Sequence, residues 1–113
     1  MQAVAAIAAL GALAQEHRLA VFRQLVQAGE NGLAAGAIAE ALGIPNSSLS
    51  FHLAQLRNAG LILQERQHRS LIYRANYPAM NALLGYLTEN CCAGSPCEAE
   101  PARVPQAPER KSA

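Results

Sequence analysis

The only cysteines of the chain, Cys91, Cys92 and Cys97, lie within seven consecutive positions of a 113-residue sequence. Thiolates are soft ligands that select soft ions, and three sulfurs without a histidine or carboxylate suit a pyramidal As(III) or Sb(III) centre. Tetrahedral zinc requires a fourth ligand, which Glu89 or Glu98 could supply, so zinc, cadmium and lead stay open. A third thiol beside an adjacent pair also permits a disulfide that responds to oxidants. The segment therefore predicts a soft-ion site or a redox site.

The residues around the cysteines allow one subunit to supply all three sulfurs. Cys91 and Cys92 would follow each other about 100° apart at the end of the last predicted helix. Gly94 and the Ser95-Pro96 pair can then reverse the chain and return Cys97 to the same point. Because the number of cysteines is odd and no export signal is recognised, the sequence argues against a structural disulfide framework. We expect free thiols.

The composition is that of one small, mainly helical domain. With 51% hydrophobic residues, 4% aromatic residues and no tryptophan, the chain favours helices over a sandwich or barrel. The net charge of +1 excludes a global attraction to nucleic acid, so any such attraction must be local. Residues 47–74 provide it, because they carry four arginines against one glutamate.

The N-terminal run 3–14 contains no charged residue and is apolar on every side. It is too short to span a bilayer and no basic residue precedes it, so we interpret it as a helix of a cytoplasmic protein without a membrane partner. A domain of this size has little interior in which to bury such a helix. We expect a second subunit to cover it; packing along its own domain is the alternative.

Apolar periodicity predicts five helices and one hairpin. After a short helix at 35–42, Gly43-Ile44-Pro45 interrupts the chain, and a longer helix begins with Asn46 or Ser47 as its cap and closes at Gly60. Two helices joined by so tight a turn form a helix-turn-helix. The other predicted elements are helices at 3–14, 16–28 and 77–90, with strands at 61–66 and 70–75.

The two predicted strands are joined by Gln67-His68-Arg69, which lacks the residue types of a two-residue turn, so a longer loop is expected. The last helix, which Pro78 starts, carries an apolar stripe that reaches Leu87 and continues to Cys91 four residues later.

The helix after the tight turn presents two different faces. Leu49, Leu53 and Leu56 share one face with His52 beside them, and we interpret His52 as a packed structural histidine. The opposite face is polar, small and almost uncharged, which suits a major groove, and an aromatic edge there can contact a thymine methyl. A solvated face or a protein-binding face is the alternative. The predicted base-contacting residues are Ser47, Ser48, Ser50, Phe51 and Gln55; Arg66, His68 and Arg69 would contact phosphates or the minor groove, supported by Arg57 and Arg74.

The string SFHLAQLRNAGL at 50–61, followed by a hairpin that contains Tyr73, resembles the winged helix-turn-helix of the ArsR/SmtB family of metal-responsive bacterial repressors. The resemblance covers roughly residues 10–90. It implies a mainly α fold of five helices with a β-hairpin wing, and a homodimer paired through the first and last helices. It also implies a palindromic double-stranded operator, which is released when an inducer binds.

The sequence departs from the family pattern at several positions. The stretch that matches the Cys-Val-Cys motif of the original arsenic repressors is 33–37, which has no thiol, and the last helix lacks the histidines and aspartates of zinc-sensing members. Phe51 stands where many relatives have a second histidine or a basic residue, so no base preference can be carried over. By elimination the implied inducer site is Cys91, Cys92 and Cys97. This arrangement resembles a subgroup of arsenical repressors with a C-terminal vicinal pair and one further cysteine.

We therefore predict a DNA-binding and dimerisation domain at 1–90, a cysteine-rich inducer-binding segment at 91–97 and a disordered tail at 98–113. The predicted function is a transcriptional repressor that releases its operator on binding As(III), with Sb(III) as a further inducer and no organic cofactor. The alternatives are a repressor that responds to thiol oxidation or to cadmium, lead or zinc, and a protein-interaction module whose cysteines carry a metal. A thiol enzyme is not supported, because no histidine or lysine lies near Cys91-Cys92 in the sequence to activate them.

Overall fold

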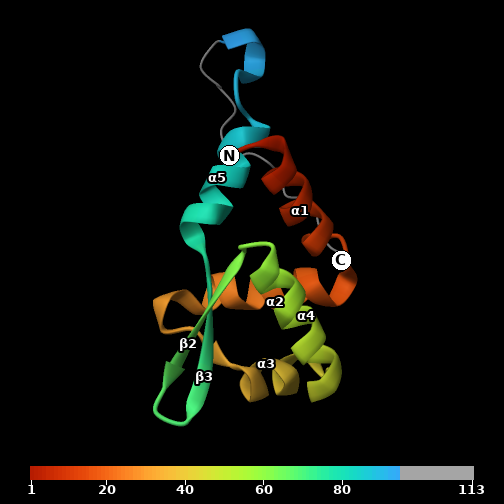
Figure 1. Ribbon diagram of the computed structural model, residues 1–113, viewed down its shortest axis with the longest axis vertical. Helices are drawn as coiled ribbons and strands as arrows, with labels where there is room; N and C mark the ends of the chain where they lie inside the picture. Colours follow the sequence, from red (N-terminus) through yellow and green to blue (C-terminus); the bar gives the residue numbers. More distant parts are fainter. Residues whose placement is uncertain (95–113) are drawn as a thin grey trace.

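The computed structural model describes residues 1–94, so Cys97 and the predicted tail at 98–113 lie outside the described part (Figure 1). Over residues 1–94 the fold consists of five α-helices and a three-stranded antiparallel sheet, which confirms the predicted fold class. The elements are α1 Ala3–Leu13, α2 Glu16–Ala28, the 3-10 turn η1 Gly29–Asn31, β1 Leu33–Ala34, α3 Ala35–Leu42, α4 Asn46–Asn58, β2 Ile62–Gln67, β3 Ser70–Ala75, α5 Tyr77–Leu87 and the 3-10 turn η2 Cys91–Gly94.

The helix α1 turns its small residues toward its own chain. Ala6, Ala9 and Ala12 are buried, whereas Val4 and Ile7 are 79% and 68% exposed. Alanines let a helix approach its neighbours closely, but each buries little apolar area. The larger side chains of Val4, Ile7 and Leu10 are left on the outside of the monomer.

The helix-turn-helix has the predicted elements, with a different start for its second helix. Gly43 ends α3 in the left-handed conformation, where its N–H donates to the Ala39 carbonyl. Pro45 then precedes α4, and neither Asn46 nor Ser47 provides the predicted side-chain cap. Proline tolerates this position because the first helical N–H groups have no partner inside the helix in any case.

The sheet has the order β1-β3-β2, and the short strand β1 was not predicted. Gln67 pairs with Ser70, so only two residues, His68 and Arg69, connect β2 to β3. The prediction of a longer loop was therefore wrong. The turn is possible because His68 adopts a φ of +57°, a conformation in which histidine is enriched among non-glycine residues.

The last helix is shorter than predicted. The Asn76 side chain caps its start by accepting from the Ala79 N–H at 3.2 Å, and the Tyr77 hydroxyl donates to the Val26 carbonyl of α2 at 3.0 Å. The helix ends at Leu87 rather than Asn90, and the Thr88 hydroxyl donates back to a carbonyl of the last turn. The chain leaves the helix before it reaches the cysteines.

The elements are arranged with α3, α4 and the β2–β3 wing toward one end and α1 with α5 toward the other (Figure 1). Within residues 1–94 no single helix is long and apolar enough to cross a membrane; one pair of helices bent by 102°, Ala3–Leu13 with Glu16–Asn31, meets that condition by length and composition alone. The core joins all the main elements, and its largest fully buried side chains are Val21, Leu25, Ile38, Leu49, Leu56, Leu61 and Ile62.

Candidate nucleic-acid interface and thiol segment

The helix α4 presents the two faces that its sequence predicts. Leu49, Leu53 and Leu56 are buried in the core. The predicted base-contacting residues lie away from it: Ser47, Ser48, Ser50 and Phe51 are exposed and Gln55 is half-buried. The structure therefore leaves a polar helix face of the size and chemistry that a major groove accepts.

His52 connects α4 to the two N-terminal helices. Its Nδ1 lies 3.4 Å from Nη1 of Arg18, whose Nε donates to the Ala12 carbonyl at the end of α1 at 2.7 Å. The His17 ring lies 5.6 Å from the His52 ring between centroids. Burial lowers the pKa of His52, and the charges of Arg18 and His17 add to this shift. A neutral His52 accepts from Arg18 through Nδ1, so the interaction requires the deprotonated ring.

The connection through Arg18 was not predicted, although His52 was correctly interpreted as a packed histidine. Arg18 and His52 are 34 positions apart in the chain. No local periodicity relates residues at that distance, so only the tertiary structure reveals the contact.

The wing carries the predicted cationic residues on its surface. Arg66, His68 and Arg69 are exposed, and Arg57 on α4 donates a hydrogen bond to the Gln64 side chain of β2. Arg74 was predicted to support phosphate binding, but its guanidinium lies 3.3 Å from Glu65 and 3.7 Å from Glu30. Arg74 is thus partly neutralised, whereas Arg66 and Arg69 have no carboxylate partner among the described residues.

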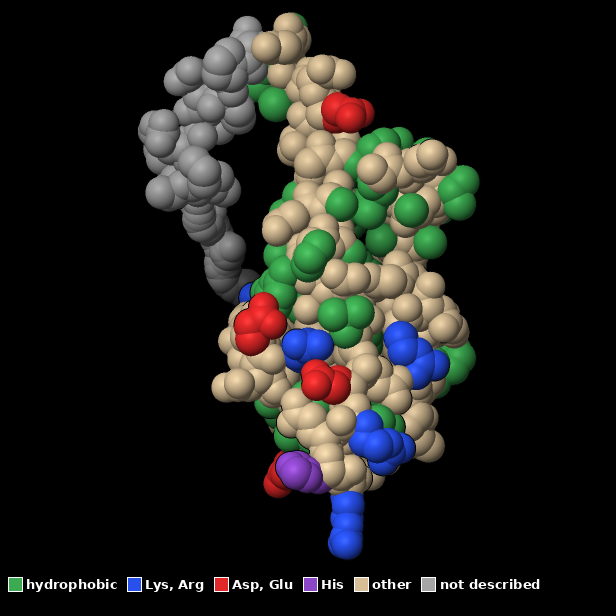
Figure 2. Space-filling view, turned by 60° about the vertical axis from the view of Figure 1, so that its left-hand side comes forward, with side chains coloured by type: hydrophobic (Ala, Val, Ile, Leu, Met, Phe, Trp, Pro, Cys, Tyr) green, Lys and Arg blue, Asp and Glu red, His purple; other side chains and the backbone are tan. Residues whose placement is uncertain are grey.

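Charged side chains lie mostly at the end of the molecule that carries the wing, and exposed apolar side chains lie mostly at the other end. Figure 2 shows the blue arginine side chains over the lower part of the molecule, where the wing lies, with red acidic side chains among them, and green hydrophobic side chains mostly over the upper part. The positive charge is therefore local, as the distribution of arginines in 47–74 predicts.

The cysteines do not lie where helical geometry would put them. Cys91 is half-buried and Cys92 is exposed, and both belong to η2 rather than to α5. Asn90 and Cys92 adopt φ values of +59° and +56°, so the chain turns sharply on both sides of Cys91. The predictions that Cys91 and Cys92 end the last helix and that Cys91 continues its stripe were wrong.

The thiol segment lies far from the DNA-facing elements. Figure 1 places the blue segment beyond α5 at the opposite end of the molecule from the wing tip, in a structure whose longest extent is 50 Å. Among residues 1–94, no three histidine, cysteine, aspartate or glutamate side chains are grouped closely enough to hold a metal ion. A three-sulfur site requires Cys97, which lies outside that range.

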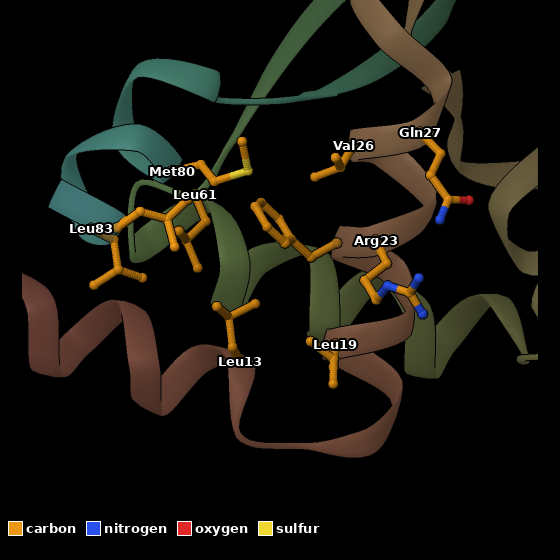
Figure 3. Close-up of a pocket in the computed structure, with 10 residues that line it drawn as sticks. Leu13, Leu19, Arg23, Val26, Gln27, Leu61, Met80 and Leu83 are labelled. Atoms are coloured by element: carbon orange, nitrogen blue, oxygen red, sulfur yellow. The ribbon is translucent and has the colours of Figure 1, made fainter. Parts of the chain in front are cut away.

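An apolar hollow opens between α1, α2 and α5 (Figure 3). It has a volume of about 390 Å³, and Arg23 and Gln27 are the polar members of its lining. Figure 3 shows Met80 and Leu83 of α5 facing Val26 of α2 across it, with Leu13 at its α1 side. Leu84 and Leu87 of α5 are exposed nearby in the chain at 55% and 53%. The lining is Leu13, Leu19, Phe22, Arg23, Val26, Gln27, Leu61, Met80, Leu83 and Leu84.

The tight helix pair, the outward polar face of α4 and the wing together define a winged helix-turn-helix DNA-binding protein. Comparison with known proteins agrees. Residues 13–65 match a family model described as a helix-turn-helix domain. The HTH-type transcriptional regulator YgaV of Escherichia coli (strain K12) is 32% identical over 87 residues, which span 77% of this chain and 86% of that protein.

Two solved structures have the same fold. The ArsR-like transcriptional regulator from Rhodococcus sp. RHA1 superposes with a TM-score of 0.70 at 23% identity, covering 80% of this chain and 81% of that one. The homodimeric winged helix-turn-helix domain of Mb0332 from Mycobacterium bovis, a possible ArsR-family regulator, superposes at 0.61 with 28% identity, covering 76% and 80%. The chain belongs to the ArsR/SmtB family of winged helix-turn-helix regulators. It is a DNA-binding transcriptional regulator.

Proposed function

We propose that this regulator is a homodimeric repressor that releases its operator when As(III), or Sb(III), binds to Cys91, Cys92 and Cys97. The observation that carries the proposal is the gathering of every thiol of the chain into one segment directly after α5. Three thiolates match the three-coordinate preference of these ions better than they match tetrahedral zinc. The exposed Cys92 and half-buried Cys91 are accessible to an ion from solvent.

The homodimer is supported by the apolar surface of α1 and α5. Val4 and Ile7 of α1 and Leu84 of α5 are more than half exposed, and Leu84 also lines the hollow between α1, α2 and α5. An exposed apolar surface of this kind marks an interaction site. Residues 1–15 contain no charged side chain, so burying α1 against a second copy removes no charge from water. A homodimeric relative of the same fold adds to this argument.

The coupling between the thiols and the DNA runs through packed helices. The cysteine segment follows α5, and α5 packs against α1. The end of α1 is joined to α4 through Arg18, which bonds both the Ala12 carbonyl and His52. A change at the end of α5 that moves α1 can therefore alter the setting of α4. A tenfold to hundredfold loss of operator affinity needs only about 1.4–2.7 kcal/mol of coupling.

The proposal is tested by gel-shift assays on the DNA upstream of the gene, titrated in turn with arsenite, zinc and hydrogen peroxide. Release by micromolar arsenite, without release by the other two, supports the arsenical sensor. Release by zinc alone, or failure to bind double-stranded DNA at low salt, contradicts it.

A thiol-redox switch is the second candidate, because two cysteines are adjacent and one of them is exposed. Release by peroxide that a monothiol reductant reverses is the result that favours this candidate over arsenic.

A further inference from the structure

Phe51 is the one large apolar side chain on the outward face of α4, and it is 58% exposed. Its neighbours on that face, Ser47, Ser48 and Ser50, are small and polar. A solvent-exposed phenyl ring contributes nothing to the core, whose α4 contacts come from the leucines on the other side. Phe51 lies in the first half of α4, and this part of a recognition helix contacts base edges.

The Phe51 ring has a fixed neighbour behind it. The His52 ring lies 5.8 Å from the Phe51 ring between centroids, at an interplanar angle of 64°. This edge-to-face arrangement is a favourable one for aromatic pairs. His52 is itself buried and held by Arg18 and the His17 ring. Phe51 is therefore backed by a ring that the core keeps in place, which lowers the entropy lost when Phe51 makes a contact.

The chemistry of the major groove limits what such a ring can recognise. Base edges there display hydrogen-bond donors and acceptors, and the apolar group among the standard bases is the C5 methyl of thymine. A phenyl ring placed against a donor or acceptor would leave that group without its water. We propose that Phe51 contacts a thymine methyl in each half-site and thereby determines a thymine preference in the operator.

This inference rests on the proposed binding of α4 to operator DNA. The occupant of the α4 face is duplex DNA rather than a protein partner, because the exposed Arg66 and Arg69 have no carboxylate partner among residues 1–94 and complement phosphates. The contact also accounts for an aromatic residue on a face that is otherwise polar.

The expected size of the effect follows from the burial of one methyl group per half-site. Such burial changes affinity about fourfold, and a dimer that binds two half-sites multiplies this to about fifteenfold. Replacing thymine by uracil at that position removes the methyl group and leaves every donor and acceptor in place. Replacing the thymine–adenine pair by 5-methylcytosine–guanine keeps the methyl group.

The experiment begins with selection of duplexes from a random library by the full-length wild-type protein. The affinity of the selected duplex is then measured by fluorescence anisotropy with thymine, uracil or 5-methylcytosine at each half-site position. We expect about fifteenfold weaker binding for uracil at one symmetric position, and 5-methylcytosine binding there better than unmethylated cytosine. F51A should bind thymine and uracil duplexes equally, whereas F51L should keep part of the difference.

Leu63 of β2 provides the matched control, because it is also an exposed apolar residue, at 42%. L63A should discriminate thymine from uracil as the wild type does. Equal affinity of the wild type for thymine and uracil duplexes at every position, or discrimination retained in F51A, overturns the role of Phe51 while leaving DNA binding intact. Failure of the wild type to select any duplex overturns the proposed function and this inference with it.

Discussion

Replacing Arg69 by glutamine removes one exposed guanidinium from the turn of the wing. The proposed dimer loses two such groups. Each phosphate that a cationic side chain neutralises contributes about −0.9 to the slope of log affinity against log salt. The magnitude of the slope should therefore decrease by about 1.8. If Arg66 and Arg69 of both subunits make four phosphate contacts, wild-type affinity drops about 150-fold between 50 and 200 mM salt. R69Q should drop only about 12-fold over the same range.

The assay is fluorescence anisotropy of a labelled duplex at a series of salt concentrations, for the wild type, R69Q and R74Q. Arg74 is the matched control, because its guanidinium lies against Glu65 at 3.3 Å and is not free to neutralise a phosphate. R74Q should therefore keep the wild-type slope. A wild-type slope in R69Q, or an equal loss of slope in both variants, would refute the assignment of the wing turn to the DNA backbone.

Three further predictions concern the dimer interface, the protonation of His52 and the close approach of Gly32 to β3. I7D places a charge on the exposed face of α1 and should convert the dimer to monomer in sedimentation equilibrium, whereas a folded dimer of I7D contradicts the interface. Burial lowers the pKa of His52 in the folded protein, so the same histidine takes up its proton at a higher pH in the unfolded chain, near its ordinary pKa of about 6.5. The free energy of unfolding from urea titrations should therefore fall from pH 7 to 5, and less steeply in H52Q; identical pH profiles would disprove this. G32A should destabilise the fold by about 1–3 kcal/mol in the same titration, since a Cβ at φ +68° would lie 2.5 Å from the Tyr73 carbonyl oxygen; unchanged stability would contradict that close approach.

The helix-turn-helix could be predicted from the sequence because its signals are local. Gly43 adopts the left-handed conformation that ends α3, and Leu49, Leu53 and Leu56 are buried as their spacing requires. The outward residues of α4 followed from the same spacing. These residues also carry the family resemblance, so the fold and the class of protein could be predicted from the sequence.

The wing turn could not be predicted, because tertiary packing overrides the local signals there, and the end of α5 could not, because no strong helix-breaking residue marks it. The register that buries Tyr73 and Ala75 forces a two-residue turn at His68-Arg69, although neither residue type is typical of one. The last helix ends at Leu87 without a glycine or proline to mark the position. The sequence therefore predicts a last helix that is longer than the observed α5.

In the proposed mechanism, the thiols of the segment that follows α5 control the affinity of α4 for its operator. The most direct measurement is the affinity of full-length protein for operator DNA with and without arsenite, for the wild type and for C91S, C92S and C97S. We predict a tenfold to hundredfold loss of affinity in the wild type and a loss of that response in the serine variants, with unchanged affinity when arsenite is absent. Release of the operator by arsenite in all three variants would contradict the account.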